Sequence, residues 1–227
     1  MIIGVTGPAG GGKDTASEYI QRYNFAQIAF ADPVKRIALD VYDFSVDQLW
    51  GPSDNRNAPD HRYPRAHGPF VDGKCACCGC SSTDCLLVGC FLTPRYALQT
   101  LGTEWGRHCH TETWATKGMR VAEKLQRGGY SYSPVQGLEY NPSSSFKGVV
   151  ISDLRFKNEM AHVRAHKGLL LRVKRGAPTI HYSGHASEAE QLDIPDSEFD
   201  AVIRNDGTLQ ELFVKLAHFM GVHGCPM

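Results

Sequence analysis

Short apolar segments alternate along the chain with segments in which apolar residues recur every three or four positions. The apolar segments are short enough for buried strands, and they cover residues 2–6, 25–30, 149–151, 169–173 and 201–203. The periodic segments predict amphipathic helices over residues 16–23, 34–41, 93–105, 117–126, 157–166 and 209–220. This alternation predicts an α/β fold in three layers, a sandwich with helices on both faces of a five-stranded, mostly parallel sheet.

Three stretches lack such a period. Residues 51–92 contain four prolines and six cysteines, so we expect an irregular, cysteine-rich insertion with its own small core or metal. Residues 130–146 are rich in Ser, Pro, Gly and Tyr and predict a loop, and the polar residues 175–197 predict a mobile flap. The predicted core therefore consists of residues 1–50 and 93–227, with residues 51–92 inserted into it.

The charge balance excludes some classes of protein. The chain has 24 Lys and Arg against 24 Asp and Glu, whereas a general nucleic-acid binder normally carries an excess of basic residues. No apolar run approaches the roughly 20 residues of a membrane-spanning helix. No basic leader precedes the apolar residues 1–5, so we expect no secretory signal, no membrane partner and a cytoplasmic location.

A glycine-rich turn follows the first predicted strand and precedes the first helix. Two glycines five positions apart, Gly7 and Gly12, are followed by Lys13, which is the spacing of a phosphate-binding loop. With Gly10 and Gly11 between them, the backbone can turn its N–H groups inward toward an anion. We expect this P-loop to bind a nucleoside triphosphate, with Lys13 on the β- and γ-phosphates.

The residues after Lys13 depart from the usual pattern. Asp14 stands where Ser or Thr is usual, and Thr15 comes next. Either side chain could contact Mg²⁺, and the sequence leaves open which one does. Further along, Asp32, Asp153 and Asn205 each follow a predicted strand, so a parallel sheet would place them with the glycine-rich turn at one edge, where ligands of such sheets bind.

Six motifs in order carry a resemblance to a known family. They are G-K-D-T from Gly12, F-A-D-P-x-K from Phe30, T-P-R-x-x-L-Q-x-L-G-T-E-x-G-R from Thr93, D-x-R-F-x-N-E from Asp153, H-x-S-E from His185 and N-D-G from Asn205. Together they cover most of the chain except the cysteine-rich segment. The sequence resembles the bacteriophage deoxynucleoside monophosphate kinases, a branch of the P-loop nucleoside monophosphate kinases.

The resemblance implies a P-loop NTPase fold and a reaction. The γ-phosphoryl of ATP would pass to a deoxynucleoside monophosphate (dNMP), giving the diphosphate for phage DNA precursor synthesis in the host cytoplasm, with Mg²⁺ as cofactor. Such an acceptor is already an anion, so it needs cations rather than a strong general base. The partner would be a small-molecule dNMP; the sequence does not fix the base, the basis of deoxyribose selection or the oligomeric state, a homodimer being one option.

The motifs also imply roles for individual residues. Lys13, Asp153 and Arg155 would serve the transfer itself. Acceptor binding would fall to Lys35, Arg95 and Arg107 on the phosphate and to Asp32, Gln99 and Trp114 on the sugar or base. Asn205 would lie near the adenine of ATP, and Arg175 would move in from the flap.

The cysteine cluster predicts a structural zinc site. Cys75 and Cys78 form the preferred first pair, and Cys85 and Cys90 close a tetrahedral site. Cys77 and Cys80 are a competing first pair, and free thiols or an iron–sulfur centre are alternatives.

Two other functions fit parts of the sequence. A kinase of a small-molecule hydroxyl, similar to dephospho-coenzyme A kinase, would use Asp32 as its general base. A zinc-bearing module could instead bind nucleotide without catalysis, although the zero net charge and the acceptor arginines argue against it.

Overall fold

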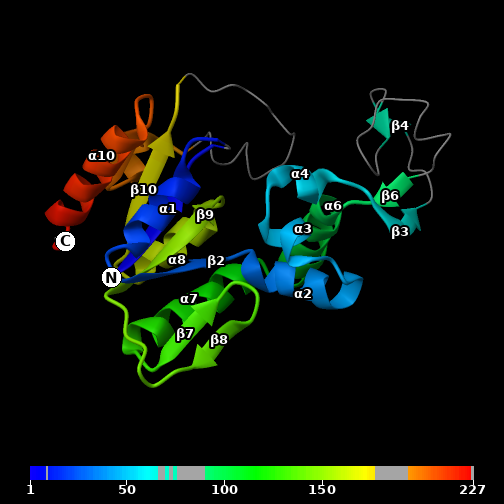
Figure 1. Ribbon diagram of the computed structural model, residues 1–227, viewed down its shortest axis with the longest axis horizontal. Helices are drawn as coiled ribbons and strands as arrows, with labels where there is room; N and C mark the ends of the chain where they lie inside the picture. Colours follow the sequence, from blue (N-terminus) through cyan, green and yellow to red (C-terminus); the bar gives the residue numbers. More distant parts are fainter. Residues whose placement is uncertain (9, 66–69, 72–73, 76–89, 177–193, 226–227) are drawn as a thin grey trace. The chain divides into compact units, whose positions relative to one another are not determined.

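The computed structural model describes residues 1–8, 10–65, 70–71, 74–75, 90–176 and 194–225 (Figure 1). The chain forms two compact units. The first consists of Met1–Asp32 and Glu112–Met227, and the second of Pro33–Thr111. Along the described residues, no helix is both long enough and apolar enough to cross a bilayer.

A five-stranded sheet forms the centre of the first unit. Its strands are β1 (Ile2–Thr6), β2 (Phe25–Ala29), β9 (Gly148–Leu154), β10 (Leu169–Lys174) and β11 (Ala201–Arg204), in the order β11-β10-β1-β9-β2. Every neighbouring pair in the sheet is parallel. The predicted α/β fold with a five-stranded parallel sheet is confirmed.

Helices cover both faces of this sheet. Helices α1 (Lys13–Gln21) and α10 (Leu209–Val222) pack on one face, and α7 (Thr113–Arg127) and α8 (Lys157–Ala165) pack on the other (Figure 1). Successive strand residues point to opposite faces. Ile2 therefore packs in the core beneath α7 and α8, whereas Ile3, which is fully buried, packs beneath α1 and α10. The apolar runs of the sequence are strands buried on both faces.

A β-hairpin occupies the stretch for which the sequence predicts a loop. Strands β7 (Tyr130–Ser133) and β8 (Gly137–Tyr140) pair antiparallel, so the loop prediction is wrong for residues 130–140, whereas residues 141–146 contain no helix or strand. The rings of Tyr130 and Tyr140 meet edge to face with centroids 5.8 Å apart. Cross-strand aromatic pairs stabilise such ribbons even where Ser and Gly dominate the composition.

The second unit is made of short elements. Its helices are α2 (Asp32–Tyr42), α3 (Val46–Trp50), α4 (Ser53–Asn57) and α6 (Pro94–Gln99), and its strands are β3 (Asp60–Arg65), β4 (Phe70–Val71), β5 (Lys74–Cys75) and β6 (Cys90–Leu92). The predicted irregularity of residues 51–92 is wrong for the described part. Strand β3 pairs antiparallel with β6, but its sequence DHRYPR is mostly polar and only Asp60 is buried, so it has no apolar alternation to detect.

A π-helix continues α6. The predicted helix start is confirmed, because Thr93 Oγ1 accepts a hydrogen bond from Tyr96 N at 3.2 Å and Pro94 follows. Beyond Gln99 the chain forms the π-helix η1 (Thr100–Arg107), whose turns are wider than those of an α-helix. The predicted amphipathic α-helix over residues 93–105 is therefore correct only as far as Gln99.

Candidate active site

The carboxyl ends of all five strands lie at one edge of the sheet, because the strands are parallel. Gly7 follows β1, Asp32 lies three residues after the end of β2, Asp153 lies near the end of β9, and Asn205 follows β11. The predicted convergence of these residues on one edge is therefore what the topology produces. Arg175, directly after β10, joins them.

The glycine-rich loop passes too close to its neighbours for larger residues. A Cβ atom at Gly7 would lie 2.1 Å from the carbonyl oxygen of Val173 in β10. At Gly12 it would lie 2.3 Å from Asn205 Nδ2, and the φ of 99° at Gly12 is one that side chains rarely adopt. The loop is therefore a close-fitting backbone cradle between β1 and α1.

Helix α1 begins immediately after this loop. Its N-cap is Gly12, which has no side chain to cap the first turn. The first N–H groups of a helix have no partner within the helix, so they favour an anion at this end. Lys13, the first residue of α1, adds a positive charge there.

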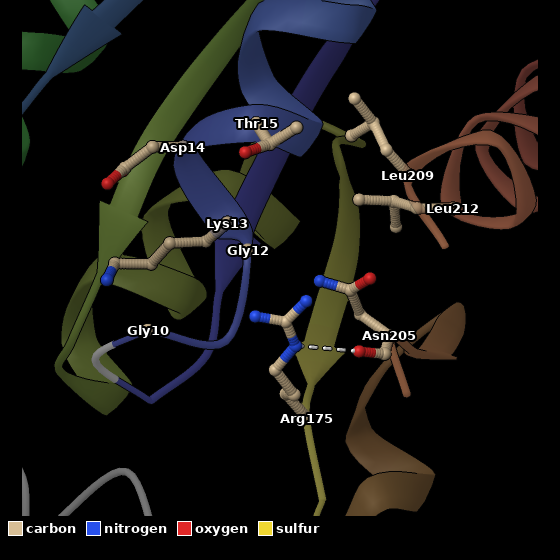
Figure 2. A pocket seen from close by; sticks show the side chains of 9 residues that line it. All are labelled: Gly10, Gly12, Lys13, Asp14, Thr15, Arg175, Asn205, Leu209 and Leu212. Atoms are coloured by element: carbon tan, nitrogen blue, oxygen red, sulfur yellow. Dashed lines mark hydrogen bonds between the residues drawn. The ribbon is translucent and has the colours of Figure 1, made fainter. Parts of the chain in front are cut away.

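A cavity of about 290 Å³ opens beside the loop (Figure 2). Its lining is Gly10, Gly12, Lys13, Asp14, Thr15, Arg175, Asn205, Leu209 and Leu212. The last two residues form an apolar wall on α10 that the sequence did not single out, because their spacing also fits an ordinary buried helix face. A polar loop facing an apolar wall suits a ligand with an anionic part and a flat apolar part.

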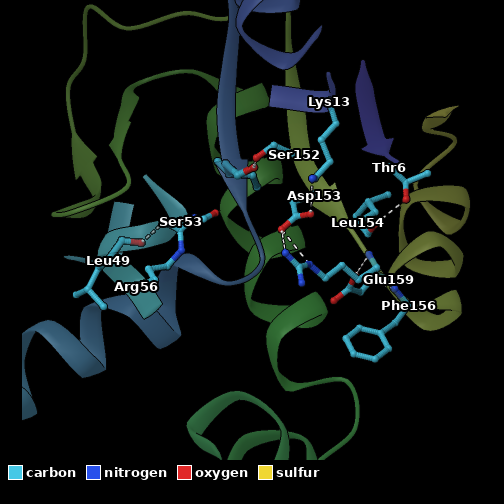
Figure 3. Close-up of polar contacts among 12 residues, drawn as sticks. Thr6, Lys13, Leu49, Ser53, Arg56, Ser152, Asp153, Leu154, Phe156 and Glu159 are labelled. Atoms are coloured by element: carbon cyan, nitrogen blue, oxygen red, sulfur yellow. Dashed lines mark hydrogen bonds and ion pairs between the residues drawn. The ribbon is translucent and has the colours of Figure 1, made fainter. Parts of the chain in front are cut away.

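Asp153 connects two cations (Figure 3). Its Oδ1 lies 3.6 Å from Lys13 Nζ, and its Oδ2 accepts hydrogen bonds from Arg155 Nε and Nη2 at 2.9 and 2.6 Å. The side chain of Lys13 is 12% exposed, so this cation is held in a poorly solvated place. The structure thus brings the three predicted catalytic residues together.

A β-bulge directs Asp153. The pairing of β1 with β9 shifts register between Gly4 and Thr6, and Asp153 has a φ of 64°. Thr6 Oγ1 fixes the end of the bulge by donating to the carbonyl oxygen of Leu154 at 2.7 Å. Bulges commonly re-aim a side chain next to a functional site.

Glu159 holds the backbone that carries Arg155. Its Oε2 accepts hydrogen bonds from Arg155 N at 2.8 Å and from Phe156 N at 3.2 Å. Glu159 is 7% exposed and lies in the first turn of α8. The segment from Asp153 to Glu159 is therefore one hydrogen-bonded unit.

Asn205 and Arg175 border the cavity on the side of α10. Asn205 is 6% exposed, and its Nδ2 donates to the carbonyl oxygen of Gly11 at 3.1 Å. Arg175 Nε donates to the carbonyl oxygen of Asn205 at 3.1 Å (Figure 2). Arg175 thus lines the cavity in this structure. Residues 177–193 of the predicted flap, which include His185 and Glu188, lie outside the described residues.

Asp32 is buried and hydrogen-bonded. It is 2% exposed, and its Oδ2 accepts from Ala29 N at 3.0 Å and from the Tyr132 hydroxyl at 2.8 Å. The sequence interpretation missed Tyr132, because it assigned residues 130–146 to a loop. Alternation of Tyr130 and Tyr132 with serines was the signal that could have revealed a strand.

The other predicted acceptor residues occupy different surroundings. Trp114 in the first unit is half-buried and packs against the core beneath α7 and α8. In the second unit, Lys35 Nζ lies over the Trp50 ring at 5.4 Å from its centroid, and Arg95 Nε donates to Asn57 Oδ1. Two further residues end helices of that unit, Gln99 in α6 and Arg107 in η1.

The zinc prediction falls mainly outside the described residues. Nothing is described of the Cys75 side chain or of Cys78 and Cys85, whereas Cys90 is 1% exposed in β6. Within the described part of the chain, no group of three or more His, Cys, Asp or Glu residues is placed to hold a metal ion.

Comparisons with known proteins identify one curated relative and one solved structure of interest. The chain is 28% identical over 218 residues to a protein of Acanthamoeba polyphaga mimivirus named "Putative deoxynucleotide monophosphate kinase", covering 95% of this chain and 94% of the relative. The crystal structure of TT1252 from Thermus thermophilus matches 98% of this chain and 97% of its own with 17% identity, at a TM-score of 0.44 that supports no inference. No protein-family model matches the sequence. The chain is thus similar to the viral protein along nearly the whole length of both.

Proposed function

We propose that the protein is an ATP-dependent deoxynucleoside monophosphate kinase, which transfers the γ-phosphoryl of ATP to a dNMP and releases a dNDP. The observation that carries this proposal is the meeting of Lys13 and Arg155 on Asp153 beside the glycine-rich loop. The named activity of the viral relative supports the same class of reaction. The phage origin and the role in DNA precursor synthesis stay predictions.

The donor polyphosphate fits the loop and the start of α1. N–H groups of a helix start and the Lys13 ammonium group stabilise negative charge, which accumulates on the transferring group. Asp153 holds Lys13 and Arg155 at fixed positions before the nucleotide arrives. Preorganised cations need little rearrangement as the transition state forms, and this lowers the barrier.

Magnesium fits the oxygen-bearing residues near the loop. Asp14, Thr15 and Asp153 supply carboxylate and hydroxyl oxygens, the ligands that this hard ion prefers. The ion usually takes only one or two protein carboxylates and completes its shell with phosphate oxygens and water, so the few acidic groups here suffice. When bound, Mg²⁺ would neutralise charge on the donor phosphates.

Acceptor binding is assigned to cations of the second unit. Lys35, Arg95 and Arg107 would bind the acceptor phosphate, and Gln99 would hydrogen-bond the base. Because the attacking group is a phosphate oxygen, no general base is required. Asp32, whose Oδ2 accepts from Ala29 and Tyr132, and Trp114 would shape the region around the sugar and base.

A coupled ADP-release assay tests this function. The purified chain is supplied with ATP and Mg²⁺ and with each common and modified dNMP, and in parallel with dephospho-coenzyme A. Turnover with at least one dNMP, and none with dephospho-coenzyme A, is expected. Turnover with dephospho-coenzyme A alone would show a kinase of a small-molecule hydroxyl. No turnover with any acceptor, together with tight DNA binding in a separate binding assay, would show a non-catalytic module.

A further inference from the structure

Asn205 contacts the backbone of the glycine-rich loop. Its carboxamide is buried, and Nδ2 donates to the carbonyl oxygen of Gly11 at 3.1 Å. A carbonyl oxygen can only accept, so it must face the nitrogen rather than the oxygen of the amide. The family resemblance implies that Asn205 lies near the adenine of ATP, and in the structure the nitrogen of its amide contacts the loop.

Holding the Gly11 carbonyl also fixes the next N–H group. In a planar trans peptide, the C=O of one residue and the N–H of the next point in opposite directions. The peptide that joins Gly11 to Gly12 therefore turns the Gly12 N–H away from Asn205. Glycine peptides rotate more freely than others, so without an external partner this peptide would sample other orientations.

The two partners are matched in size. A Cβ atom at Gly12 would lie 2.3 Å from Asn205 Nδ2, so the amide can approach only because Gly12 has no side chain. The hydrogen bond therefore depends on both residues.

Asn205 is itself held by the strands and not by α1. Its N–H donates to the carbonyl oxygen of Lys174 at 2.7 Å, and its carbonyl oxygen accepts from Arg175 Nε at 3.1 Å. The adjacent Asp206 accepts a hydrogen bond from Gly176 N through Oδ1. The ends of β10 and β11 thus provide a rigid support that orients the loop.

We propose that Asn205 is a positioning residue, which orients the Gly12 N–H toward the polyphosphate of the donor and makes no essential contact with the base. This inference rests on the proposed function, because it takes the loop to bind the donor phosphates. It assigns the energetic effect of Asn205 to the triphosphate, which every nucleotide donor and even inorganic tripolyphosphate carries.

Binding of tripolyphosphate and of ATP to Asn205→Ala tests the proposal by calorimetry. Both affinities should fall by the same factor, about tenfold, which corresponds to about 1.4 kcal/mol. The variant keeps the backbone carbonyl oxygen of residue 205, and therefore also the hydrogen bond that this oxygen accepts from Arg175 Nε. Leu209→Ala is the matched control: Leu209 lines the same cavity with an apolar side chain, so its loss should weaken ATP but not tripolyphosphate. If Asn205→Ala, like this control, weakened the binding of ATP but not of tripolyphosphate, the proposal would be overturned.

A measurement on the unaltered chain guards against misfolding of the variant. In nuclear magnetic resonance spectra of the amide groups, binding of tripolyphosphate should shift the resonance of the Gly12 N–H. Replacing tripolyphosphate with ATP should leave the side-chain amide resonances of Asn205 unchanged. A shift of those resonances only with the adenine-bearing ligand would show base recognition and refute the positioning role.

The two proposals can fail separately. If the wild-type chain binds tripolyphosphate and Asn205→Ala binds it equally well, the positioning role is wrong and the kinase proposal stands. If both binding effects appear as expected but no dNMP is phosphorylated, the kinase proposal is wrong and the positioning role stands.

Discussion

Lys13 Nζ lies 3.6 Å from Asp153 Oδ1, and Asp153 reaches this position from a backbone with a φ of 64°. Residues other than glycine seldom adopt this left-handed conformation, although Asp and Asn tolerate it better than most. Unusual backbone conformations persist where the surrounding structure holds them, and they concentrate at functional sites. Here the bulge in β9 directs one carboxylate to both Lys13 and Arg155.

The charge of Asp153 is the first quantity to test. Asp153→Asn keeps a side chain that tolerates the left-handed conformation but removes the negative charge that holds the two cations. We expect the turnover rate for dNMP phosphorylation to fall by about 10²-fold. Glu18→Gln removes an exposed acid from the same helix as Lys13 and should leave this rate unchanged. An Asp153→Asn enzyme that turns over as fast as the wild type would contradict a role for this charge.

The left-handed backbone conformation of Asp153 should also affect the stability of the protein. Asp153→Gly and Asp153→Ala both remove the carboxylate, so their difference reports the strain of a side chain at this φ, reduced by the greater freedom of glycine in the unfolded chain. Alanine at a positive φ is strained, whereas glycine is not. We expect the free energy of unfolding of Asp153→Ala to be about 1 kcal/mol below that of Asp153→Gly, measured with urea. Equal stability of the two variants would argue against the left-handed bulge.

Variants of the hydrogen-bonded pair Tyr132 and Asp32 distinguish transfer to a phosphate acceptor from transfer to a hydroxyl with Asp32 as general base. Asp32→Asn should weaken the apparent affinity for the dNMP and slow turnover by less than about tenfold, because a phosphate acceptor needs no strong base. Tyr132→Phe removes one hydrogen bond and should lower the free energy of unfolding by about 1 kcal/mol, with a smaller effect on dNMP affinity. If turnover by Asp32→Asn instead slowed by about 10³-fold or more, Asp32 would be a general base.

Much of the sheet was predictable from composition along the chain. Ile2 to Thr6 and residues 149–151 are buried on both faces, and such short, mainly apolar runs suit strands of a parallel sheet that helices cover on both sides. The prediction that the residues following the strands share one edge of the sheet came from the rule that parallel strands are joined by right-handed crossovers. The placement of Gly7, Asp153 and Asn205 at this edge is a consequence of topology, which sequence alternation reveals well.

Local deviations from regular structure were not predictable. The bulge at Asp153 and the π-helix that begins at Thr100 each alter register, and register leaves little trace in a single sequence. The contact between Asn205 and Gly11 joins residues 194 positions apart. The geometry around Lys13 depends on the bulge and on the contact between Asn205 and Gly11, so it required coordinates.

Zinc binding by the cysteine cluster stays a prediction that metal analysis can test. Protein purified without chelators should carry about one zinc per chain, because two close cysteine pairs suit tetrahedral coordination. Cys78→Ser should lower the zinc content, whereas Cys109→Ser, which alters an exposed cysteine outside the cluster, should not. Less than about half an equivalent of zinc in the wild-type chain would count against the site.

The second unit contains a carboxylate whose protonation should affect stability. Asp60 is 7% exposed, and the hydrogen bonds from the Arg62 side chain are the main reason that its pKa lies well below the usual range. Gln48 Nε2 adds a further hydrogen bond at 3.2 Å. A depressed pKa in the folded state means that this stabilisation is complete above the unfolded pKa of about 3.9 and is lost as pH falls toward the folded value.

Asp60→Asn should therefore unfold at a lower temperature than the wild-type chain at neutral pH. The gap in Tm should be widest near pH 7 and should narrow as pH falls below about 4, because only the wild-type carboxylate becomes protonated there. Asp40→Asn, at an exposed position in α2, should show no such gap. Thermal unfolding followed by circular dichroism across this range measures the effect, and a gap that stays constant with pH would mean that Asp60 acts through packing rather than through its charge.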